Sequence, residues 1–287
     1  MLSYQHIYHA GNFADVHKHA VLIRLLKTLK GKPAGFQVLD THAGRGLYDL
    51  SSEEATRNRE FDTGAACFMD DPAPLMADYL SIVRKFNPEG ELKVYPGSAV
   101  IAREMMRPSD RLICVERHPG EFLELQKALG NEPNTKLLQE DGFKALVDMV
   151  PFPERRGLVV VDPSYEIKTE YVDLARHLQQ AWKKWPQGIF LIWYPMLEAQ
   201  GHRQFLTALR NTDVKDVMVS EIRLHEPPQE KFRMYGSGVV IINPPWPQDT
   251  LDALTRHIAS RLPVKAFPDV FWLDNQQINP ETGVIKL

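Results

Sequence analysis

Phe36-Gln-Val-Leu-Asp40 runs directly into Thr41-His-Ala-Gly-Arg-Gly46. The first part is a short apolar run, which is typical of a buried strand. The second part contains two glycines, which allow a backbone to approach a ligand closely at the end of a strand. The loop is not the dinucleotide fingerprint G-x-G-x-x-G, but a strand that ends in this way indicates a nucleotide-binding α/β fold.

Four further strand-like runs also end in small or polar residues, at 111–116, 136–141, 157–162 and 188–194. Helix-like segments accompany them at 120–129, 143–149, 169–185 and 197–210. Strands that alternate with helices predict right-handed βαβ units and a parallel sheet. The runs are apolar throughout, which indicates a sheet covered by helices on both faces.

The end of the chain has a different pattern. Residues 214–223 and 238–243 are strand-like, and the Pro-containing stretch 224–236 between them shows no convincing helix. Two consecutive strands without a crossover helix pair antiparallel. We therefore predict the Rossmann-like α/β fold of class I S-adenosylmethionine-dependent methyltransferases, with a mostly parallel sheet and an antiparallel C-terminal strand. We expect residues 1–287 to form a single methyltransferase domain.

Residues 47–95 are too many for a loop after the first strand. They carry helix-like patterns at 53–69 and 75–86, so we expect a helical insertion subdomain. It would lie at the carboxyl end of the sheet, where it could cover the site or grip a large substrate. The alternative is that this insertion has no function of its own.

Polar residues end two of the later strands where a nucleoside would bind. Glu116 can accept hydrogen bonds from both hydroxyls of a ribose, unless it is an ordinary exposed carboxylate. Asp141, followed by Gly142, can accept a hydrogen bond from the exocyclic amine of an adenine. The alternative role of Asp141 is to cap the helix that follows.

Asp162-Pro-Ser-Tyr165 ends the next strand and resembles the [D/N/S]-P-P-[Y/F/W] motif of amino-methyltransferases. The lone pair of an adenine amine is delocalised into the ring, so the amine is a poor nucleophile. The Asp162 carboxylate and the Pro163 carbonyl can accept hydrogen bonds from both amine hydrogens and aim the lone pair. Tyr165 can stack on the base. Ser164 departs from the usual second proline.

These strand-end motifs favour a methyltransferase because they follow one another in the expected order. A second match, Asn243-Pro-Pro-Trp246, lies beyond the last strand-like run. In the predicted topology it falls at the antiparallel edge, so we interpret it as a turn that ends a strand.

The N-terminus gathers polar and aromatic residues before a helix-like run at 15–30, namely Tyr4, His6, His9, His17, Lys18 and His19. Their spacing suggests a metal site at first, but no HExxH motif and no nearby cysteine supports one, and we predict no metal. We expect the segment to fold over the cofactor, with Lys18 paired to its methionine carboxylate. The alternative is a set of ordinary surface and core histidines.

Composition excludes several classes of protein. The 287 residues are 44% hydrophobic and 25% charged, which excludes a disordered or coiled-coil chain. The net charge is −3, so any nucleic acid would bind a local basic patch such as Arg24, Lys27, Lys30 and Lys32. Two cysteines cannot build a disulfide framework. We see no signal peptide or membrane span and expect a cytoplasmic protein.

The chain resembles the ribosomal RNA large subunit methyltransferase J family over nearly its whole length. The resemblance rests on Leu2-Ser-Tyr-Gln-His6, Leu39-Asp-Thr-His-Ala-Gly44, Tyr95-Pro-Gly-Ser98, Trp193-Tyr-Pro195 and Val240-Ile-Ile-Asn-Pro-Pro-Trp246. It implies an adenine-N6 methyltransferase of 23S ribosomal RNA that uses S-adenosylmethionine. It also implies a protein-free or early-assembly RNA substrate and a monomer.

The resemblance assigns roles to particular residues. Cofactor contacts fall on His19, His42, Ser98, Glu116, Asp141 and Gly142, with Lys18 and Asp162 beside the cofactor. The catalytic position is Asp162 with Pro163 and Tyr165, and Tyr4 and Tyr165 contact the substrate. Members are also described as proteins that use external DNA, but no nuclease motif supports that activity here.

Two other functions stay open from the sequence. The same chemistry on DNA adenine, a protein glutamine amide or a small molecule would use a similar motif. A non-enzymatic nucleic-acid binding protein with a degenerate pocket is the third possibility, and Ser164 is the feature that favours it.

Overall fold

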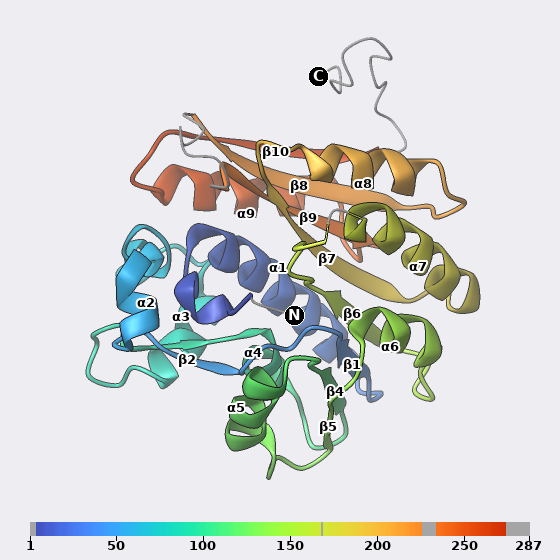
Figure 1. Cartoon of the computed structure of the whole chain (residues 1–287), viewed down its shortest axis with the longest axis horizontal. Helices are drawn as coiled ribbons and strands as arrows, with labels where there is room; N and C mark the ends of the chain where they lie inside the picture. The colour runs from blue at the N-terminus through green and yellow to red at the C-terminus, as the bar shows by residue number, and fades with distance from the viewer. Residues whose placement is uncertain (1–3, 168, 226–233, 274–287) are drawn as a thin grey trace.

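The computed structural model describes residues 4–167, 169–225 and 234–273. These residues form an eight-stranded sheet with helices on both faces, together with a small two-stranded sheet (Figure 1). The order across the large sheet is β10-β8-β9-β7-β6-β1-β4-β5, and β2 pairs with β3.

The strands are β1 (Gln37–Asp40), β2 (Leu47–Asp49), β3 (Val94–Pro96), β4 (Arg111–Val115), β5 (Thr135–Leu138), β6 (Gly157–Val161), β7 (Ile189–Met196), β8 (Val217–Leu224), β9 (Gly236–Ile242) and β10 (Ala266–Trp272). The α-helices are α1 (Phe13–Lys30), α2 (Glu53–Asn58), α3 (Ala77–Lys85), α4 (Ser98–Met105), α5 (Pro119–Leu129), α6 (Gly142–Asp148), α7 (Glu170–Lys184), α8 (Gly201–Arg210) and α9 (Gln248–Arg261).

The strand pairing confirms the predicted fold class. β5, β4, β1, β6 and β7 run parallel. β9 lies antiparallel between β7 and β8 and completes the C-terminal pair. This is the mostly parallel, Rossmann-like sheet of class I S-adenosylmethionine-dependent methyltransferases. The strand order reverses at β1, and a ligand crevice is expected beside the carboxyl ends of the strands at such a reversal.

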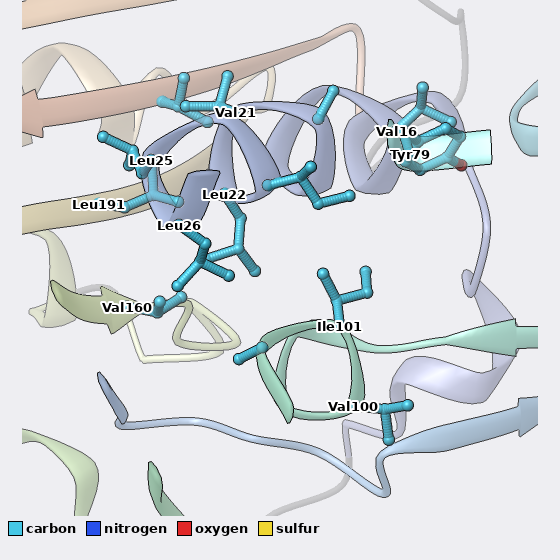
Figure 2. Close-up of a cluster of buried hydrophobic side chains, with 14 of the residues drawn as sticks. Val16, Val21, Leu22, Leu25, Leu26, Tyr79, Val100, Ile101, Val160 and Leu191 are labelled. Atoms are coloured by element: carbon cyan, nitrogen blue, oxygen red, sulfur yellow. The ribbon is translucent and has the colours of Figure 1, made fainter. Parts of the chain in front are cut away.

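Alternate residues of the central strands serve two separate hydrophobic cores. Val38 of β1 faces the core that contains α1, α4 and α9, whereas its neighbour Leu39 faces the core of α6, α7 and α8. Figure 2 shows the first core, where Leu22 and Leu26 of α1 pack near Val160 of β6. α1 is consequently buried along most of its length. This burial holds the polar residues of its first turns, Asp15, His17, Lys18 and His19, in fixed positions.

The chain departs from the sequence predictions in the regions away from the central strands. Within 53–69 only α2 is an α-helix, because Arg59 adopts a left-handed conformation and two 3-10 turns follow it. The elements α4, α9 and β10 were not predicted. Most of the Pro-containing stretch 224–236 lies outside the described residues.

Candidate active site

A cavity of about 140 Å³ opens at the carboxyl ends of the parallel strands. Its walls come from the segments that follow β1, β4, β5 and β6, from β7, and from the N-terminal segment together with α1. Residues far apart in the sequence therefore meet at the edge where doubly wound sheets bind ligands.

The loop after β1 is held by buried polar contacts. The Ser98 hydroxyl, at the start of α4, donates a hydrogen bond to Asp40 at 2.6 Å. Burial raises the pKa of Asp40 to about 6, although this hydrogen bond opposes the shift. Gly44 has a φ of 60°, and an added Cβ would lie 2.3 Å from the Tyr48 hydroxyl. The loop therefore requires glycine at position 44.

His42 presents a hydrogen-bond acceptor to the cavity. The Thr41 hydroxyl donates to the Val160 carbonyl at 2.9 Å, so it must accept at 2.8 Å from Nδ1–H of His42. Nε2 is left as the acceptor, because burial lowers the pKa of His42 to about 4 and keeps the ring neutral. Gly142 lies against this ring, and a Cβ there would fall 2.8 Å from Nε2.

Glu116 and Asp141 stand at the ends of β4 and β5 and line the cavity. Glu116 accepts hydrogen bonds from the backbone N–H groups of Gly44, at 3.0 Å, and of His118, at 2.6 Å. Asp141 caps α6 through the N–H of Lys144, so the alternative role considered for it is present in the structure. Carboxylates have lone pairs to spare, so both can still accept hydrogen bonds from a ligand.

Asp162 is joined to the N-terminal part of the chain through Lys18. The ammonium of Lys18 lies 2.5 Å from Asp162 Oδ2 and 3.0 Å from Asp15. Asp15 also accepts a hydrogen bond from His6, whose other nitrogen contacts the Tyr4 hydroxyl at 2.9 Å. The first residues of the described chain are thus tied to Asp162 by a continuous polar network.

The cavity carries many more acidic than basic side chains. Six carboxyl groups line it, compared with the two cations Lys18 and Arg117. The acidic residues are Glu116, Glu121, Asp141, Asp162, Glu166 and Glu170. Glu121 is also paired with Arg45 at 2.6 Å, but carboxyl groups still outnumber cations, which favours a cationic ligand over a polyphosphate.

The structure brings most of the predicted site residues to this cavity, namely Tyr4, Lys18, His42, Ser98, Glu116, Asp141, Gly142, Asp162 and Pro163. His19 and Tyr165 do not line it. His19 is buried, with Nδ1 2.9 Å from the Tyr95 hydroxyl. Tyr165 is 7% exposed, and its hydroxyl donates to the Trp193 carbonyl at 2.5 Å.

Several lining residues were not assigned to the site from the sequence, including His6, Tyr48, Arg117, Phe143 and Trp193. Trp193 lies within β7, and the pairing of Val161 with Ile192 places it level with Asp162. The rule that selected Asp162 takes residues that follow a strand, so it would not have selected Trp193. His6 belongs to the N-terminal segment that was predicted to fold over the cofactor, but no individual role was assigned to it from the sequence.

The second Pro-Pro motif lies away from the cavity. Asn243 follows β9 and its side-chain amide donates to the carbonyls of Pro186, at 2.8 Å, and Gly188, at 2.7 Å. These residues precede β7, so the motif lies at the amino ends of the parallel strands, whereas the cavity lies at their carboxyl ends. The prediction of a turn that ends a strand is confirmed.

No group of three or more His, Cys, Asp or Glu side chains among the described residues is arranged to hold a metal ion. Within the same residues, no helix is long and apolar enough to cross a membrane.

Comparisons with known proteins identify the family of the chain. The family model described as "Ribosomal RNA large subunit methyltransferase D, RlmJ" matches residues 33–272. The Ribosomal RNA large subunit methyltransferase J of Escherichia coli (strain K12) is 39% identical over 249 residues, which cover 86% of this chain and 88% of the relative. The protein of the same name from Haemophilus influenzae is 37% identical over 253 residues, covering 87% and 90%.

A crystal structure of a protein from Legionella pneumophila has the same fold. It matches with a TM-score of 0.85 and 32% sequence identity, covering 92% of this chain and 98% of that chain. The family model and the two relatives together span most of the chain. The chain therefore belongs to the ribosomal RNA large subunit methyltransferase J family.

Proposed function

We propose that this protein transfers a methyl group from S-adenosylmethionine to the N6 amine of an adenine in 23S ribosomal RNA. The observation that carries the proposal is that Asp162 and Pro163 line the same cavity as Glu116 and Gly142. One cavity thus combines groups suited to a nucleoside with groups suited to an amine. The names of the two relatives supply the substrate class.

The cavity fits a cationic nucleoside. Its excess of carboxyl groups suits a sulfonium, and glycine at position 142 lets the backbone pack against Thr41 and His42, where a Cβ would clash. When bound, S-adenosylmethionine supplies an electrophilic methyl group on a positively charged sulfur. In this proposal Glu116 holds the ribose, Asp141 and Gly142 hold the adenine, and His42 and Ser98 complete the cofactor site.

Asp162 and Pro163 prepare the acceptor amine. Lys18 binds Oδ2 of Asp162, whereas no hydrogen bond from the described residues reaches Oδ1. Oδ1 and the Pro163 carbonyl can therefore each accept one amine hydrogen, which directs the lone pair toward the methyl group. The new N–C bond would form as the bond between the methyl carbon and sulfur breaks, which leaves S-adenosylhomocysteine, and the extra proton of the amine would pass to water during or after transfer.

Lys18 has a different role here from the one expected from the sequence. Its ammonium contacts Asp15 and Asp162, so we propose that it orients the Asp162 carboxylate and does not hold the methionine carboxylate. Tyr4 stands at the mouth of this network and is proposed to contact the substrate. His19 packs beneath the site against Tyr95 and would support α1.

Transfer of labelled methyl from S-adenosylmethionine to large-subunit RNA tests the proposal. The RNA is taken protein-free from a strain that lacks this gene, and the product nucleosides are separated. Labelled N6-methyladenosine is the expected product, and Asp162→Ala should abolish it while cofactor binding changes by about threefold at most. Joint loss of binding and transfer would contradict the role of Asp162.

The same assay separates the alternatives. Label on DNA or on a protein glutamine, without label on RNA, would overturn the RNA proposal. We propose that protein-free RNA or an early assembly intermediate is the substrate, which a parallel assay on mature large subunits tests. An rRNA substrate implies action in the cytoplasm, and light scattering would test the proposed monomer.

A further inference from the structure

Trp193 is the aromatic side chain of β7 that reaches the cavity beside the catalytic motif. It lines the cavity together with Asp162 and Pro163, and it is partly exposed. Tyr165, the aromatic residue of the motif itself, is turned away. Its ring stacks on Tyr171 with centroids 4.4 Å apart, and its hydroxyl supports the Trp193 backbone. Tyr165 therefore supports the backbone of Trp193, while its own ring is covered by Tyr171.

The indole of Trp193 is also held from behind. Its Nε1–H donates to the Ser237 hydroxyl of β9 at 3.1 Å, and that hydroxyl lies 3.2 Å from Nδ1 of His17. Nε2 of His17 lies 2.8 Å from the Ser220 hydroxyl of β8, which lies 2.7 Å from Thr255 of α9. His17, Ser220, Ser237 and Thr255 are all 0% exposed.

The direction of every hydrogen bond in this chain follows from its far end. The Thr255 hydroxyl donates to the Leu251 carbonyl at 2.8 Å, so it must accept the hydrogen of Ser220. The Ser220 oxygen is then free to accept from Nε2–H of His17. Burial lowers the pKa of His17 to about 3, so the ring is neutral and its Nδ1 is an acceptor.

The remaining two bonds are thereby determined. Ser237 donates its hydrogen to Nδ1 of His17, and its oxygen accepts the N–H of Trp193. Each buried donor has one acceptor, and no alternative arrangement satisfies all of them. These hydrogen bonds fix the orientation of the indole, since any other rotamer of Trp193 would leave the Ser237 oxygen without its donor.

We propose that the indole of Trp193 is the aromatic surface against which the acceptor base packs. Ser237 and His17 are positioning residues that hold the indole beside Asp162. This inference rests on the proposed function and deepens it by assigning the base-binding wall of the site. A planar base that is taken out of its stack requires such a surface, and a fixed ring holds the amine in line with the carboxylate.

Methyl-transfer kinetics on protein-free large-subunit RNA test the role of the ring. Trp193→Leu keeps an apolar side chain without an aromatic face, and we expect kcat/KM for RNA to fall about tenfold to hundredfold. Trp193→Phe keeps a ring and should lose about fivefold. The Kd for S-adenosylmethionine should change by about twofold at most in both. Trp246→Leu, outside the cavity, is the matched control and should retain the wild-type kcat/KM.

A double-mutant cycle tests the positioning residue. Ser237→Ala removes the acceptor of the indole N–H and should lower kcat/KM about fivefold in the wild-type protein. In the Trp193→Phe background the same change should have no further effect, because phenylalanine has no N–H to hold. Equal losses in both backgrounds would mean that Ser237 acts only on stability, which would overturn its positioning role.

Tryptophan fluorescence gives a readout that does not need turnover. Adenosine is titrated into the protein saturated with S-adenosylhomocysteine, and base packing should quench the emission of the wild-type protein but not of Trp193→Phe. Unchanged quenching in Trp193→Phe, or a wild-type kcat/KM in Trp193→Leu, would overturn the proposal. Absence of methyl transfer by the wild-type protein would instead overturn the proposed function, so the two failures are distinct.

Discussion

The ammonium nitrogen of Lys18 lies 2.5 Å from a carboxylate oxygen of Asp162. It also lies 3.0 Å from Asp15, whose side chain is 1% exposed, so one buried cation joins α1 to the end of β6. Burial alone would lower the pKa of Lys18, but the two carboxylates outweigh it and raise the pKa above its usual range. The site therefore keeps this positive charge at physiological pH.

Replacing Lys18 with methionine should destabilise the protein in a pH-dependent way. Asp15 and Asp162 would face each other without a cation, and the free energy of unfolding near pH 7.5 should fall by about 3 kcal/mol. Without Lys18 the pKa of Asp15 would rise from its lowered value, so the folded variant would take up a proton and the deficit should shrink toward about pH 4.5. Urea unfolding at the two pH values measures this difference.

Lys27→Met on the same helix is the control for Lys18. Lys27 pairs with Asp78 at 2.6 Å, but its side chain is 66% exposed, so its loss should cost under about 1 kcal/mol. If the deficit of Lys18→Met were the same at both pH values, it would reflect lost packing and not the unpaired carboxylates.

Gly142→Ala should damage the proposed cofactor site directly. The added Cβ would lie 2.2 Å from the Thr41 carbonyl oxygen and 2.7 Å from Cε1 of His42, so the backbone or the ring must shift. We expect a loss of about 2 kcal/mol in stability and of about tenfold or more in S-adenosylmethionine affinity, measured by calorimetry. Gly31→Ala, at a φ of −61°, is the control and should change neither quantity appreciably. If Gly142→Ala bound S-adenosylmethionine with the wild-type affinity, Gly142 would not be part of the cofactor site.

Glu221→Gln should stabilise the protein at alkaline pH. Desolvation raises the pKa of Glu221 from 4.5 to about 7, although the hydroxyl of Tyr194, 2.7 Å away, donates to its carboxylate. The folded protein then holds a proton between these pH values that the unfolded chain releases, so its stability falls as the pH rises through this window. The variant should match the wild type near about pH 4.5 and exceed it by about 2 kcal/mol near pH 8. Denaturant unfolding at both values tests this, and a difference independent of pH would contradict it.

The strand-end residues could be predicted from the sequence because their positions follow from topology alone. An apolar run that ends in Glu116 or Asp162 places that residue at the carboxyl edge of a parallel sheet, whatever the details of packing. The order of these runs along the chain then brings them to one crevice. The central strands and the antiparallel C-terminal pair were predictable for the same reason.

Features that depend on side-chain direction could not be predicted in this way. Tyr165 has a φ of 55°, and this left-handed backbone is part of a turn in which its ring lies against Tyr171 and not toward the cavity. The hydrogen-bond network that begins at Trp193 joins β7, β9, α1, β8 and α9, and it leaves no local pattern in the sequence. β10 contains Pro268, which interrupts a strand pattern but is accepted at the edge of a sheet.

Substitutions at Asn243 should separate the Asn243-Pro-Pro-Trp246 motif from the proposed catalytic motif, Asp162-Pro-Ser-Tyr165. Asn243 has a φ of 56° and donates two hydrogen bonds, to Pro186 and Gly188. Asn243→Ala loses both bonds and strains the backbone, so its free energy of unfolding should fall by about 3 kcal/mol, whereas Asn243→Gly keeps the conformation and should lose about 2 kcal/mol. Both variants should retain the wild-type kcat/KM for RNA below their melting temperatures, in contrast to Asp162→Ala. If folded Asn243→Gly lost methyl transfer, the second motif would contribute to catalysis, although it lies at the opposite end of the parallel strands from the cavity.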